Sequence, residues 1–444
     1  MRLTVLGTGY LGAVHAACMA DLGHEVLGVD VDVRKIETLA AGRSPFFEPG
    51  LDEVLTRATA SGRLRFSTSL QEAAEFGEVH FVCVGTPQRP GSGAADLTYV
   101  DAVVEGIAPH LRPGALVVGK STVPVGTAAR LAERLTELAP AGSGAELAWN
   151  PEFLREGFAV EDTVRPDRIV VGVTSDGAEA RLREVYAFAL GNDTPWVRTD
   201  LPTAELVKVS ANAFLATKIS FINAIAEVCD ASGADVVTLA RAIGYDARIG
   251  HRFLAAGLGF GGGCLPKDIR AFMARAGELG VSEVQYLLRQ VDEINMRRRQ
   301  RTADLAGQML GGSVLGSNVA VLGCAFKPNS DDVRDSPALN VAAALQLRGA
   351  QVRVHDPEAT ENARAIFPTL DYTTDIVKAC EQADLVLHLT EWKQYREIDP
   401  VAFAEVVRAP RLLDARNALD VDRWRAAGWT VRGLGRGSGR PGSA

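Results

Sequence analysis

The 444-residue chain lacks features that mark several large classes of protein. Its six cysteines, at positions 18, 83, 229, 264, 324 and 380, form no C-x-x-C pair and no His/Cys spacing typical of a metal site. We therefore expect no disulfide framework and no metal, and scattered thiols of this kind are typical of a reduced, cytosolic protein. There is no long basic run and the formal net charge is −8, which argues against nucleic acid as the main partner.

Long hydrophobic runs are also missing. No stretch approaches the roughly 20 apolar residues of a membrane span. The first residues, MRLTVLGTGYLG, lack the charged and then apolar pattern of a signal peptide. We therefore expect a cytoplasmic protein without a membrane partner. The composition, 47% hydrophobic and 23% charged, is that of a soluble chain long enough for two or three domains.

Short apolar runs that end in turn residues alternate with helical patterns at both ends of the chain. In the first part these runs are LTVLG (3–7), EVLGVD (25–30), EVHFVCVGTP (78–87) and ALVVGKSTVP (115–124). Runs of the same kind return in the same order as NVAVLG (318–323), AQVRVHDP (350–357) and ADLVLHLTEW (383–392). Buried strands that alternate with helices predict a parallel sheet covered on both faces. The fold class is therefore α/β, with two Rossmann-like, doubly wound domains.

The middle of the chain is helical. Residues 203–229 contain no proline or glycine after Thr203 and carry helical apolar spacing, which predicts a long helix that serves as a spine between domains or as a subunit interface. The expected domains are residues 1–200 (dinucleotide binding), 201–312 (helical) and 313–434 (second α/β domain). The Gly-, Ser- and Arg-rich residues 435–444 are expected to be a disordered tail.

A dinucleotide fingerprint follows the first strand. In GTGYLG, Gly7 permits a tight turn, Gly9 lets a pyrophosphate approach the backbone, and Gly12 permits close packing of helix on sheet. Asp30 ends the next strand, where a carboxylate accepts from a ribose 2′-hydroxyl and repels a 2′-phosphate, so NAD is favoured over NADP. Lys35 fits the adenosine side and fits a solvated helix lysine equally well. The second α/β half, with GCAFKPNSDD, lacks the fingerprint and suits a nucleotide carried by the substrate.

Cys264 stands in GFGGGCLPKD, after three glycines and before Lys267 and Asp268. A thiolate can add to an aldehyde, and the resulting thiohemiacetal can lose hydride to become a thioester that water hydrolyses. A free thiol has a pKa of about 8.5, which a nearby cation or helix N-terminus lowers. Lys267 could supply the charge and Asp268 could orient the water. The plainer alternative, a buried structural thiol, is what we expect of the other five cysteines.

Two further places could take part in the chemistry. Lys208 and Asn212 lie four residues apart on the long helix, where they could stabilise a substrate oxygen or could be a solvated lysine and a surface amide. Glu152 and Glu156, in NPEFLREG, follow a strand and a proline turn. Glu152 could position water, and an ordinary acid at a helix N-terminus is an equally good interpretation.

Together these segments resemble the UDP-glucose 6-dehydrogenase family, within the UDP-glucose/GDP-mannose dehydrogenases, over roughly residues 1–430. The resemblance rests on GTGYLG, VGTP…ADLTYV, KSTVPVGT, NPEFLREG, AELVKVSANAFLATKISFINAIAEVC, RIGHRFL…GFGGGCLPKD and AFKPNSDDVRDSP. It implies an NAD-dependent, four-electron oxidation of UDP-glucose to UDP-glucuronate through a thioester. It also implies a homodimer formed through the central helices.

The resemblance implies roles for individual residues. Cys264 would be the nucleophile, Lys208 and Asn212 would stabilise the oxyanion or transfer protons, and Asp268, Glu152 and Thr122 would serve the water. NAD would be held by Gly7, Gly9, Gly12, Asp30, Lys35, Thr86, Thr122, Glu156, Lys267 and Arg334. The sugar nucleotide would be held by Glu152, Phe153, Leu154, Arg155, Lys208, Asn212, Arg248, Gly261, Phe326, Lys327 and Arg416.

The chain departs from the family at one position. Gly263 replaces the serine or larger residue that often precedes the thiol, which is expected to loosen the loop. The motifs favour UDP-glucose and leave GDP-mannose and N-acetylated UDP-sugars open. A two-electron dehydrogenase and a non-catalytic nucleotide sensor are the rival interpretations.

Overall fold

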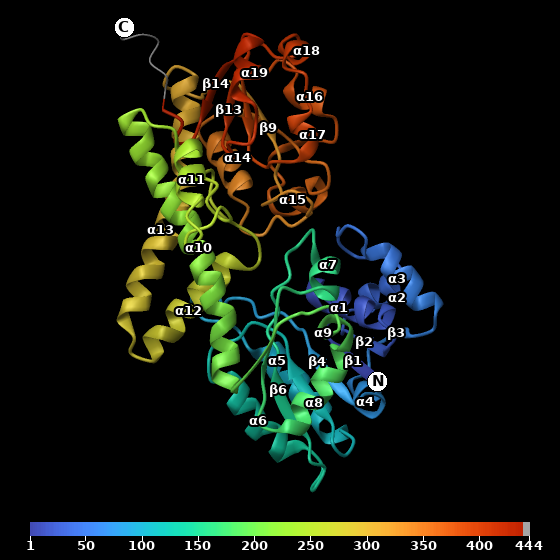
Figure 1. Cartoon of the computed structure of the whole chain (residues 1–444). Helices are drawn as coiled ribbons and strands as arrows, with labels where there is room; N and C mark the ends of the chain where they lie inside the picture. Colours follow the sequence, from blue (N-terminus) through green and yellow to red (C-terminus); the bar gives the residue numbers. More distant parts are fainter. Residues whose placement is uncertain (438–444) are drawn as a thin grey trace. The chain divides into compact units, whose positions relative to one another are not determined.

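The computed structural model describes residues 1–437 and divides into two compact units. The N-terminal unit comprises residues 1–211 and 270–280, and the C-terminal unit comprises residues 212–269 and the chain from 281 onward. Each unit has its own sheet (Figure 1). The three-domain division expected from the sequence stays a prediction.

The N-terminal sheet has eight strands in the order β3-β2-β1-β4-β5-β6-β7-β8. Pairing is parallel except between β6 and β7, which meet antiparallel where Trp149 pairs with Gly172. The strands are β1 (Arg2–Leu6), β2 (Glu25–Val29), β3 (Leu64–Ser67), β4 (Val79–Val82), β5 (Leu116–Gly119), β6 (Glu146–Trp149), β7 (Ile169–Gly172) and β8 (Trp196–Thr199).

Both faces of this sheet are buried. Along β5, Leu116 and Val118 belong to one hydrophobic core cluster, while Val117 between them belongs to another. Because successive strand residues point to opposite faces, the two clusters cover the two faces. The helices of the unit are α1 (Tyr10–Asp21), α2 (Val33–Ala40), α3 (Leu51–Ala60), α4 (Leu70–Phe76), α5 (Thr98–Ile107), α6 (Thr127–Leu138), α7 (Ala159–Val164), α8 (Asp176–Val185) and α9 (Ala187–Leu190), with a 3₁₀ turn at Ala108–His110.

The C-terminal sheet has six parallel strands in the order β11-β10-β9-β12-β13-β14. This is the doubly wound order 3-2-1-4-5-6, and the first six strands of the N-terminal sheet follow it too. The repeated α/β pattern in the sequence is thereby confirmed. The strands are β9 (Asn318–Leu322), β10 (Gln351–His355), β11 (Asp371–Thr373), β12 (Leu385–His388), β13 (Arg411–Asp414) and β14 (Thr430–Gly433).

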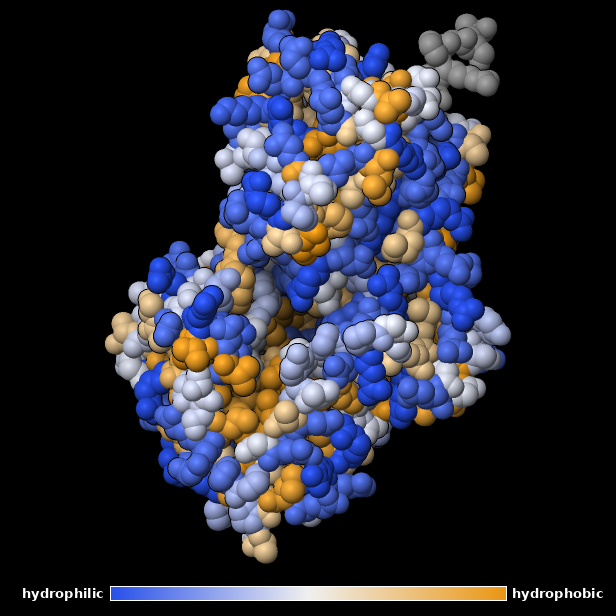
Figure 2. Space-filling model, turned by 180° about the vertical axis from the view of Figure 1, so that it is seen from behind, coloured by the Kyte–Doolittle hydropathy of each residue, from blue (hydrophilic) through white to orange (hydrophobic). Residues whose placement is uncertain are grey.

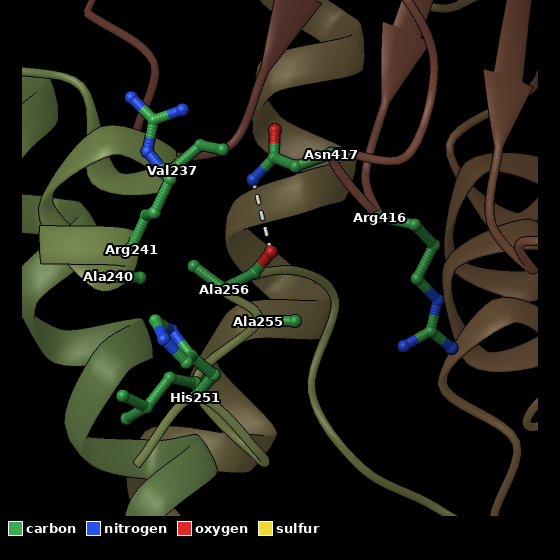
Figure 3. Close-up of a pocket in the computed structure, with 9 residues that line it drawn as sticks. Val237, Ala240, Arg241, His251, Ala255, Ala256, Arg416 and Asn417 are labelled. Carbon is green, nitrogen blue, oxygen red and sulfur yellow. Dashed lines mark hydrogen bonds between the residues drawn. The ribbon is translucent and has the colours of Figure 1, made fainter. Parts of the chain in front are cut away.

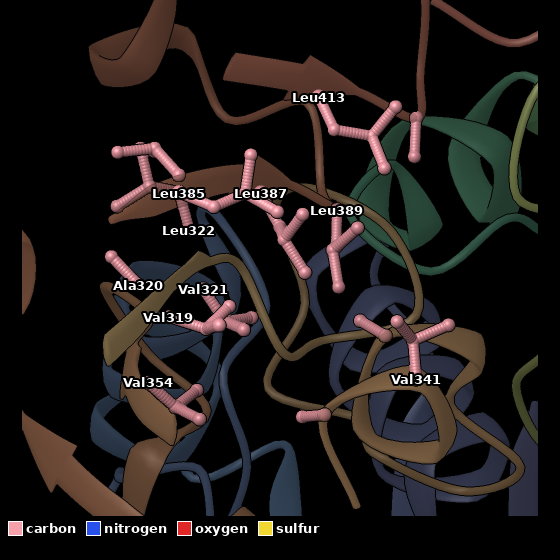
Figure 4. Packing of buried hydrophobic residues seen from close by; sticks show 14 of the residues in the cluster. Val319, Ala320, Val321, Leu322, Val341, Val354, Leu385, Leu387, Leu389 and Leu413 are labelled. Atoms are coloured by element: carbon pink, nitrogen blue, oxygen red, sulfur yellow. The ribbon is translucent and has the colours of Figure 1, made fainter. Parts of the chain in front are cut away.

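One hydrophobic core supports this second sheet. Figure 4 shows Val319 and Val321 of β9, Leu385 and Leu387 of β12, and Val341 of the helix that follows β9 within this cluster. The helices are α14 (Pro337–Leu347), α15 (Thr360–Ile366), α16 (Ile376–Cys380), α17 (Lys393–Arg396), α18 (Pro400–Ala404) and α19 (Val421–Ala426).

The central helices are α10 (Leu201–Ser232), α11 (Val236–Gly244), α12 (Leu265–Glu278) and α13 (Ser282–Met309). The long helix expected over 203–229 is therefore confirmed. Within residues 1–437, α10 alone is long and apolar enough to cross a membrane by length and composition, contrary to the expectation that no stretch would approach that limit. Ile222, Ala226 and Cys229 lie in a core cluster, so α10 is a core helix of the folded chain.

The chain after β14 partly contradicts the expected tail. Gly435 donates from its backbone to Asp230, and Arg436 forms an ion pair with Asp235, so residues 435–437 belong to the folded unit. The remaining tail residues lie outside the described part of the chain.

On the face shown in Figure 2, hydrophobic residues occur in groups interspersed with hydrophilic ones.

Candidate active site

The glycine motif after β1 has the geometry of a phosphate-binding turn. Gly7 adopts φ +92°, which favours glycine, and a Cβ on Gly12 would lie 1.8 Å from the Gly7 carbonyl oxygen. A Cβ on Gly9 would meet nothing within 4 Å, so the space beside the first turn of α1 is open. These residues therefore fit a dinucleotide pyrophosphate at the helix N-terminus.

Asp30 lies next to this motif at the end of β2. Its carboxylate accepts hydrogen bonds from the backbone N–H and the hydroxyl of Thr8, at 2.9 and 3.1 Å, and pairs with the Lys35 ammonium at 2.9 Å. Burial alone would raise the pKa of Asp30, but the bonds from Lys35, Asp32 and Thr8 outweigh it and lower the pKa. The carboxylate is therefore ionised beside the motif. Lys35 is partly exposed, but its ammonium is paired with Asp30, so it is not an ordinary solvated helix lysine.

Thr86 and Thr122 meet where β4 and β5 end. The Thr86 hydroxyl donates to the backbone carbonyl of Thr122 at 2.7 Å. In open α/β sheets ligands bind outside the carboxyl ends of the strands, and both threonines lie there. Their positions fit the cofactor role expected for them.

An ion pair between a buried lysine and a partly buried glutamate lies at the carboxyl end of β6. Lys120, which is 4% exposed, contacts Glu152 at 3.0 Å and donates to Asn150 at 3.1 Å and to the Tyr186 hydroxyl at 3.2 Å. Burial would raise the pKa of Glu152, but the charge and hydrogen bond of Lys120 outweigh it and lower the pKa. Lys120 begins the KSTVPVGT motif, yet sequence reasoning gave it no role.

Glu152 also organises the loop that follows it. Its Oε1 accepts hydrogen bonds from the backbone N–H groups of Phe153 and Leu154, at 2.7 and 3.0 Å, while Oε2 faces Lys120. Both oxygens are thus engaged within the protein. This arrangement is typical of a carboxylate that stays ionised, shapes the loop and orients a neighbouring polar group. It is less suited to a carboxylate that takes up a proton during catalysis.

Another carboxylate, which is buried, holds the other end of this loop. Glu48, 6% exposed, accepts hydrogen bonds from the backbone N–H groups of Gly157 at 2.6 Å and Ala159 at 2.7 Å. The Tyr10 hydroxyl donates to Glu48 and accepts from Gly157 at 3.1 Å. Burial, and to a lesser extent the neighbouring Glu48 carboxylate, raises the pKa of Tyr10. Tyr10 belongs to GTGYLG, so Glu48 and Tyr10 tie the dinucleotide motif to the 152–158 loop.

The loop's own side chains make separate contacts. Lys208 on α10 is half-buried, with its ammonium 5.5 Å from the centre of the Phe153 ring. Arg155 is engaged by Asp162 at 2.6 Å. Glu156 is buried. The structure thus brings Phe153 and Lys208 together, while Arg155 forms an ion pair with the nearby Asp162.

In the C-terminal unit Cys264 is the exposed thiol, and the other five described cysteines are buried. Burial raises the pKa of Cys18, Cys83 and Cys380 to about 12, as expected of core thiols. Cys264 precedes α12, and its carbonyl accepts the backbone N–H of Asp268 at 2.9 Å. Cys264 therefore lies at the N-terminal, positive end of a helix, a position that favours a thiolate.

Asp268 lies one turn into α12 and is 2% exposed. The Nδ2 of Asn212 on α10 donates to one carboxylate oxygen at 2.6 Å, and Lys267 contacts the other at 2.6 Å. Asn212, Lys267 and Asp268 are therefore together beside the start of the helix that Cys264 precedes. The sequence placed Lys267 and Asp268 beside Cys264 and paired Asn212 with Lys208, so the contact between Asn212 and Asp268 is new in the structure.

The glycines before Cys264 make room for the segment 326–335. A Cβ on Gly262 would lie 2.7 Å from the Phe326 ring, and one on Gly263 would lie 2.3 Å from the guanidinium carbon of Arg334. Gly262 also donates to the Arg334 carbonyl at 2.9 Å. The structure thus brings these segments together, and Gly263 leaves space that the Arg334 head group occupies.

Of the remaining residues expected to bind substrate, some lie beside the glycine loop and one does not. Arg416 donates to the carbonyls of Gly259 and Phe326, at 3.0 and 3.1 Å, so it belongs to this group. Lys327 lies over the Phe326 ring at 5.3 Å. Arg248 is 88% exposed and pairs with Asp246 at 2.6 Å, away from these contacts. Arg416 thus lies beside the loop, Arg248 is not brought to it within its unit, and the substrate-binding role of both stays a prediction.

The second α/β half uses its strand-end acid differently. Asp356, after β10, occupies the position that Asp30 has after β2, but it is fully buried. It accepts from the backbone N–H groups of Cys324 and Ala325, at 2.7 and 2.9 Å, and from the Trp392 ring at 3.2 Å. A carboxylate closed off in this way is unavailable to a ribose. The second α/β half therefore lacks both the glycine fingerprint and a free strand-end acid for a dinucleotide.

Comparison with known proteins agrees with a dinucleotide site in the first α/β half and a different role for the second. Residues 1–190 match the NAD-binding domain, residues 202–297 the central domain and residues 320–421 the UDP-binding domain of the UDP-glucose/GDP-mannose dehydrogenase family. The cofactor is therefore NAD, and the C-terminal half supports a UDP-sugar as substrate.

Individual relatives extend over the full chain. A UDP-glucose 6-dehydrogenase of Rhizobium meliloti is 44% identical over 440 residues, which is 98% of this chain and 100% of the relative. The structure of a UDP-glucose dehydrogenase from Pyrobaculum islandicum matches with a TM-score of 0.87 and 40% identity, over 97% of this chain and 98% of that one. A UDP-D-ManNAc dehydrogenase from Pyrococcus horikoshii matches with a TM-score of 0.86 and 26% identity, over 98% and 100%. The chain belongs to the UDP-glucose/GDP-mannose dehydrogenase family.

Proposed function

We propose that the protein oxidises UDP-glucose to UDP-glucuronate with two molecules of NAD, through a thioester on Cys264. The observation that carries the proposal is the exposed thiol at the start of α12, next to the buried Asn212 and Asp268 and the partly exposed Lys267. High identity to proteins named UDP-glucose 6-dehydrogenase supports the choice of sugar.

The proposed sequence of steps balances as follows. The C6 alcohol loses a proton and a hydride to give an aldehyde, and the Cys264 thiolate adds to the aldehyde carbon. The resulting thiohemiacetal oxyanion loses a second hydride to give a thioester. Water then replaces the sulfur, giving the carboxylate, two protons and the regenerated Cys264 thiolate. NAD, when bound, accepts each hydride.

The chain's own residues have distinct parts in these steps. Cys264 holds the substrate carbon, and Lys208 with Asn212 stabilises negative charge on the substrate oxygen. Asp268 and Thr122 orient the water, while Glu152, fixed by Lys120, keeps the 152–158 loop in place. Gly7, Gly9, Gly12, Asp30, Lys35, Thr86, Glu156, Lys267 and Arg334 hold NAD. The nucleotide-sugar is held by Phe153, Leu154, Arg155, Arg248, Gly261, Phe326, Lys327 and Arg416.

We expect a homodimer in the cytoplasm. Phe214, Phe221 and Val228 recur every seven residues on α10, and each is more than half exposed. Tyr286 and Leu287 of α13 are exposed in the same way. Apolar side chains on one helical stripe favour contact with a second copy of the chain. Sedimentation of the purified protein tests this directly.

The function is tested by assaying a panel of UDP- and GDP-sugars with NAD and counting NADH per sugar. Two NADH per UDP-glucose, with GDP-mannose and N-acetylated sugars much slower, is the expected result. One NADH per sugar would indicate a two-electron dehydrogenase. Binding of both ligands without any NADH would indicate a nucleotide sensor.

A further inference from the structure

The segment that leads to Cys264 is buried without regular structure. Residues 256–262 belong to no helix or strand, yet all seven are buried. Buried backbone N–H and C=O groups need hydrogen-bond partners, and here no ladder or helix supplies them. Side chains from elsewhere in the C-terminal unit must therefore hold this part of the backbone.

Helix α13 supplies several of them from a buried polar stripe. Asn295, Arg298 and Arg299 stand at positions i, i+3 and i+4, so they share one face of the helix, and all three are buried. Arg298 donates from Nε to the Gly257 carbonyl at 3.0 Å, and Arg299 donates from Nη2 to the Phe260 carbonyl at 3.3 Å. In the sequence this face, within NMRRRQR, has the composition of a solvated helix surface.

Asn295 makes the most complete contact. It is 0% exposed, its Oδ1 accepts the Phe260 N–H at 2.8 Å, and its Nδ2 donates to the Phe260 carbonyl at 3.0 Å. One side-chain amide thus satisfies both backbone groups of the same residue, as a neighbouring strand would. Phe260 stands four residues before Cys264.

Gly259 is matched to this amide. It adopts φ +99°, and a Cβ at this position would lie 2.4 Å from Asn295 Oδ1. Any larger residue would strain the backbone and displace the amide from Phe260. Asn295 therefore requires the first glycine of GFGGG, while Gly261, Gly262 and Gly263 leave space for residues of the 326–335 segment.

Further amides and a guanidinium fasten the same segment from other elements. The Oδ1 of Asn223 on α10 accepts the Gly257 N–H at 2.8 Å. Asn417, after β13, donates to the Ala256 carbonyl at 3.0 Å, as the dashed line in Figure 3 shows. Arg416 donates to the Gly259 carbonyl. The backbone from 256 to 260 is thus held from three sides.

We propose that Asn295 is a positioning residue for the nucleophile. By fixing Phe260 it sets the path of the glycine loop and hence the location of the Cys264 thiol at the start of α12. The proposal rests on the proposed function only in taking Cys264 as the reacting group. Asn295 itself does not touch the thiol in this arrangement; it acts through the backbone it holds.

The test uses Asn295→Asp, which keeps the shape but loses the Nδ2 donor and sets a carboxylate oxygen against the Phe260 carbonyl. Asn192→Asp is the matched control, because the exposed Asn192 also donates from Nδ2 to a backbone carbonyl, that of Phe188. The primary readout is the rate of Cys264 alkylation by iodoacetamide, followed by peptide mapping, with the five buried cysteines as internal references. NAD affinity and kcat are measured on the same full-length proteins.

We expect Asn295→Asp to change the alkylation rate of Cys264 severalfold and to lower kcat by about tenfold or more, since small displacements of reacting groups are costly. NAD affinity should stay within about twofold, and Asn192→Asp should match the wild type. Gly259→Ala, which displaces the same amide from the other side, should reproduce the effect and serves if Asn295→Asp does not fold. Unchanged alkylation and kcat in a folded variant, with only a lower Tm, would overturn the proposal. Because alkylation needs no turnover, this result is readable even if Cys264 proved not to be the nucleophile.

Discussion

Asn212 donates a hydrogen bond of 2.6 Å to Asp268, joining α10 to the first turn of α12. Lys267 contacts the other oxygen of the same carboxylate, so Asp268 is held at both oxygens in a buried position. A carboxylate fixed in this way keeps its orientation toward a neighbouring water or substrate hydroxyl without reorganisation, which is what catalysis by positioned groups requires.

Exchanging the two groups separates their roles. Asn212→Asp places two carboxylates within hydrogen-bond distance and should lower kcat by about a hundredfold, because like charges repel in a buried site. The double variant Asn212→Asp, Asp268→Asn restores one amide and one carboxylate with the hydrogen bond reversed. If Asp268 acts on water or substrate, the double variant should fold well and remain slow in steady-state assays. Recovery of wild-type kcat would show that the pair is purely structural.

The ion pair of the buried Lys120 with the partly buried Glu152 predicts a pH-dependent stability difference. Glu152→Gln leaves the Lys120 charge without its partner and should destabilise the protein by about 3 kcal/mol at pH 7. The pKa of Glu152 is lowered in the fold, so its contribution is present above the ordinary value of about 4.3 and is lost as pH falls through the lowered value. The gap between wild type and variant should therefore be constant above about pH 5 and shrink below about pH 4.

Urea titrations across this pH range measure the gap, and the double variant Lys120→Met, Glu152→Gln is the control. With both charges removed it should lie closer to the wild type than the single variant does. A gap that is independent of pH would mean that the charge of Glu152 contributes nothing to stability.

Tyr10→Phe tests the link between the glycine motif and the 152–158 loop. The variant removes the hydroxyl that donates to Glu48 and accepts from Gly157, leaving a buried carboxylate short of one partner at a cost of about 1–3 kcal/mol. We expect kcat/KM to fall about three- to tenfold as the loop loosens. Tyr99→Phe, on an exposed tyrosine of α5, is the matched control. Identical kinetics in the two variants would remove the link from the account.

Asp30 predicts a change of cofactor preference. Asp30→Ser removes the carboxylate that repels a 2′-phosphate. It also releases the Lys35 ammonium, which lies 2.9 Å from that carboxylate in the wild type, to contact the phosphate. The KM for NAD should rise about tenfold while oxidation with NADP becomes measurable. The ratio of kcat/KM for the two cofactors reports this shift, and an unchanged ratio would contradict the role given to Asp30.

Local patterns in the sequence were sufficient for part of this picture. The glycine motif with Asp30, the repeated strand order and the helix over 203–229 follow from spacing alone, and Cys264 with Asp268 lies within five residues of chain. The tail was predicted to begin too early, because hydrogen bonds from Gly435 and Arg436 to residues near the end of α10 outweigh its composition.

Other parts of the site depend on contacts that no local pattern reports. Glu48 and Gly157 are 109 residues apart in the chain, and nothing in FFEPG indicates that its acid is buried. Lys120 could be recognised only as the first residue of a motif. Asn295, Arg298 and Arg299 have the composition of an exposed helix face, and only the fold shows that a buried backbone segment is their partner.

The central claim is that Cys264 carries the sugar between two oxidation steps. Rapid chemical quenching of enzyme turning over UDP-glucose with NAD, followed by peptide mass spectrometry, tests it most directly. The account predicts a UDP-sugar adduct on the peptide containing Cys264, which Cys264→Ser would accumulate because an ester hydrolyses more slowly than a thioester. Normal production of UDP-glucuronate with Cys264 unmodified at every time point would contradict it.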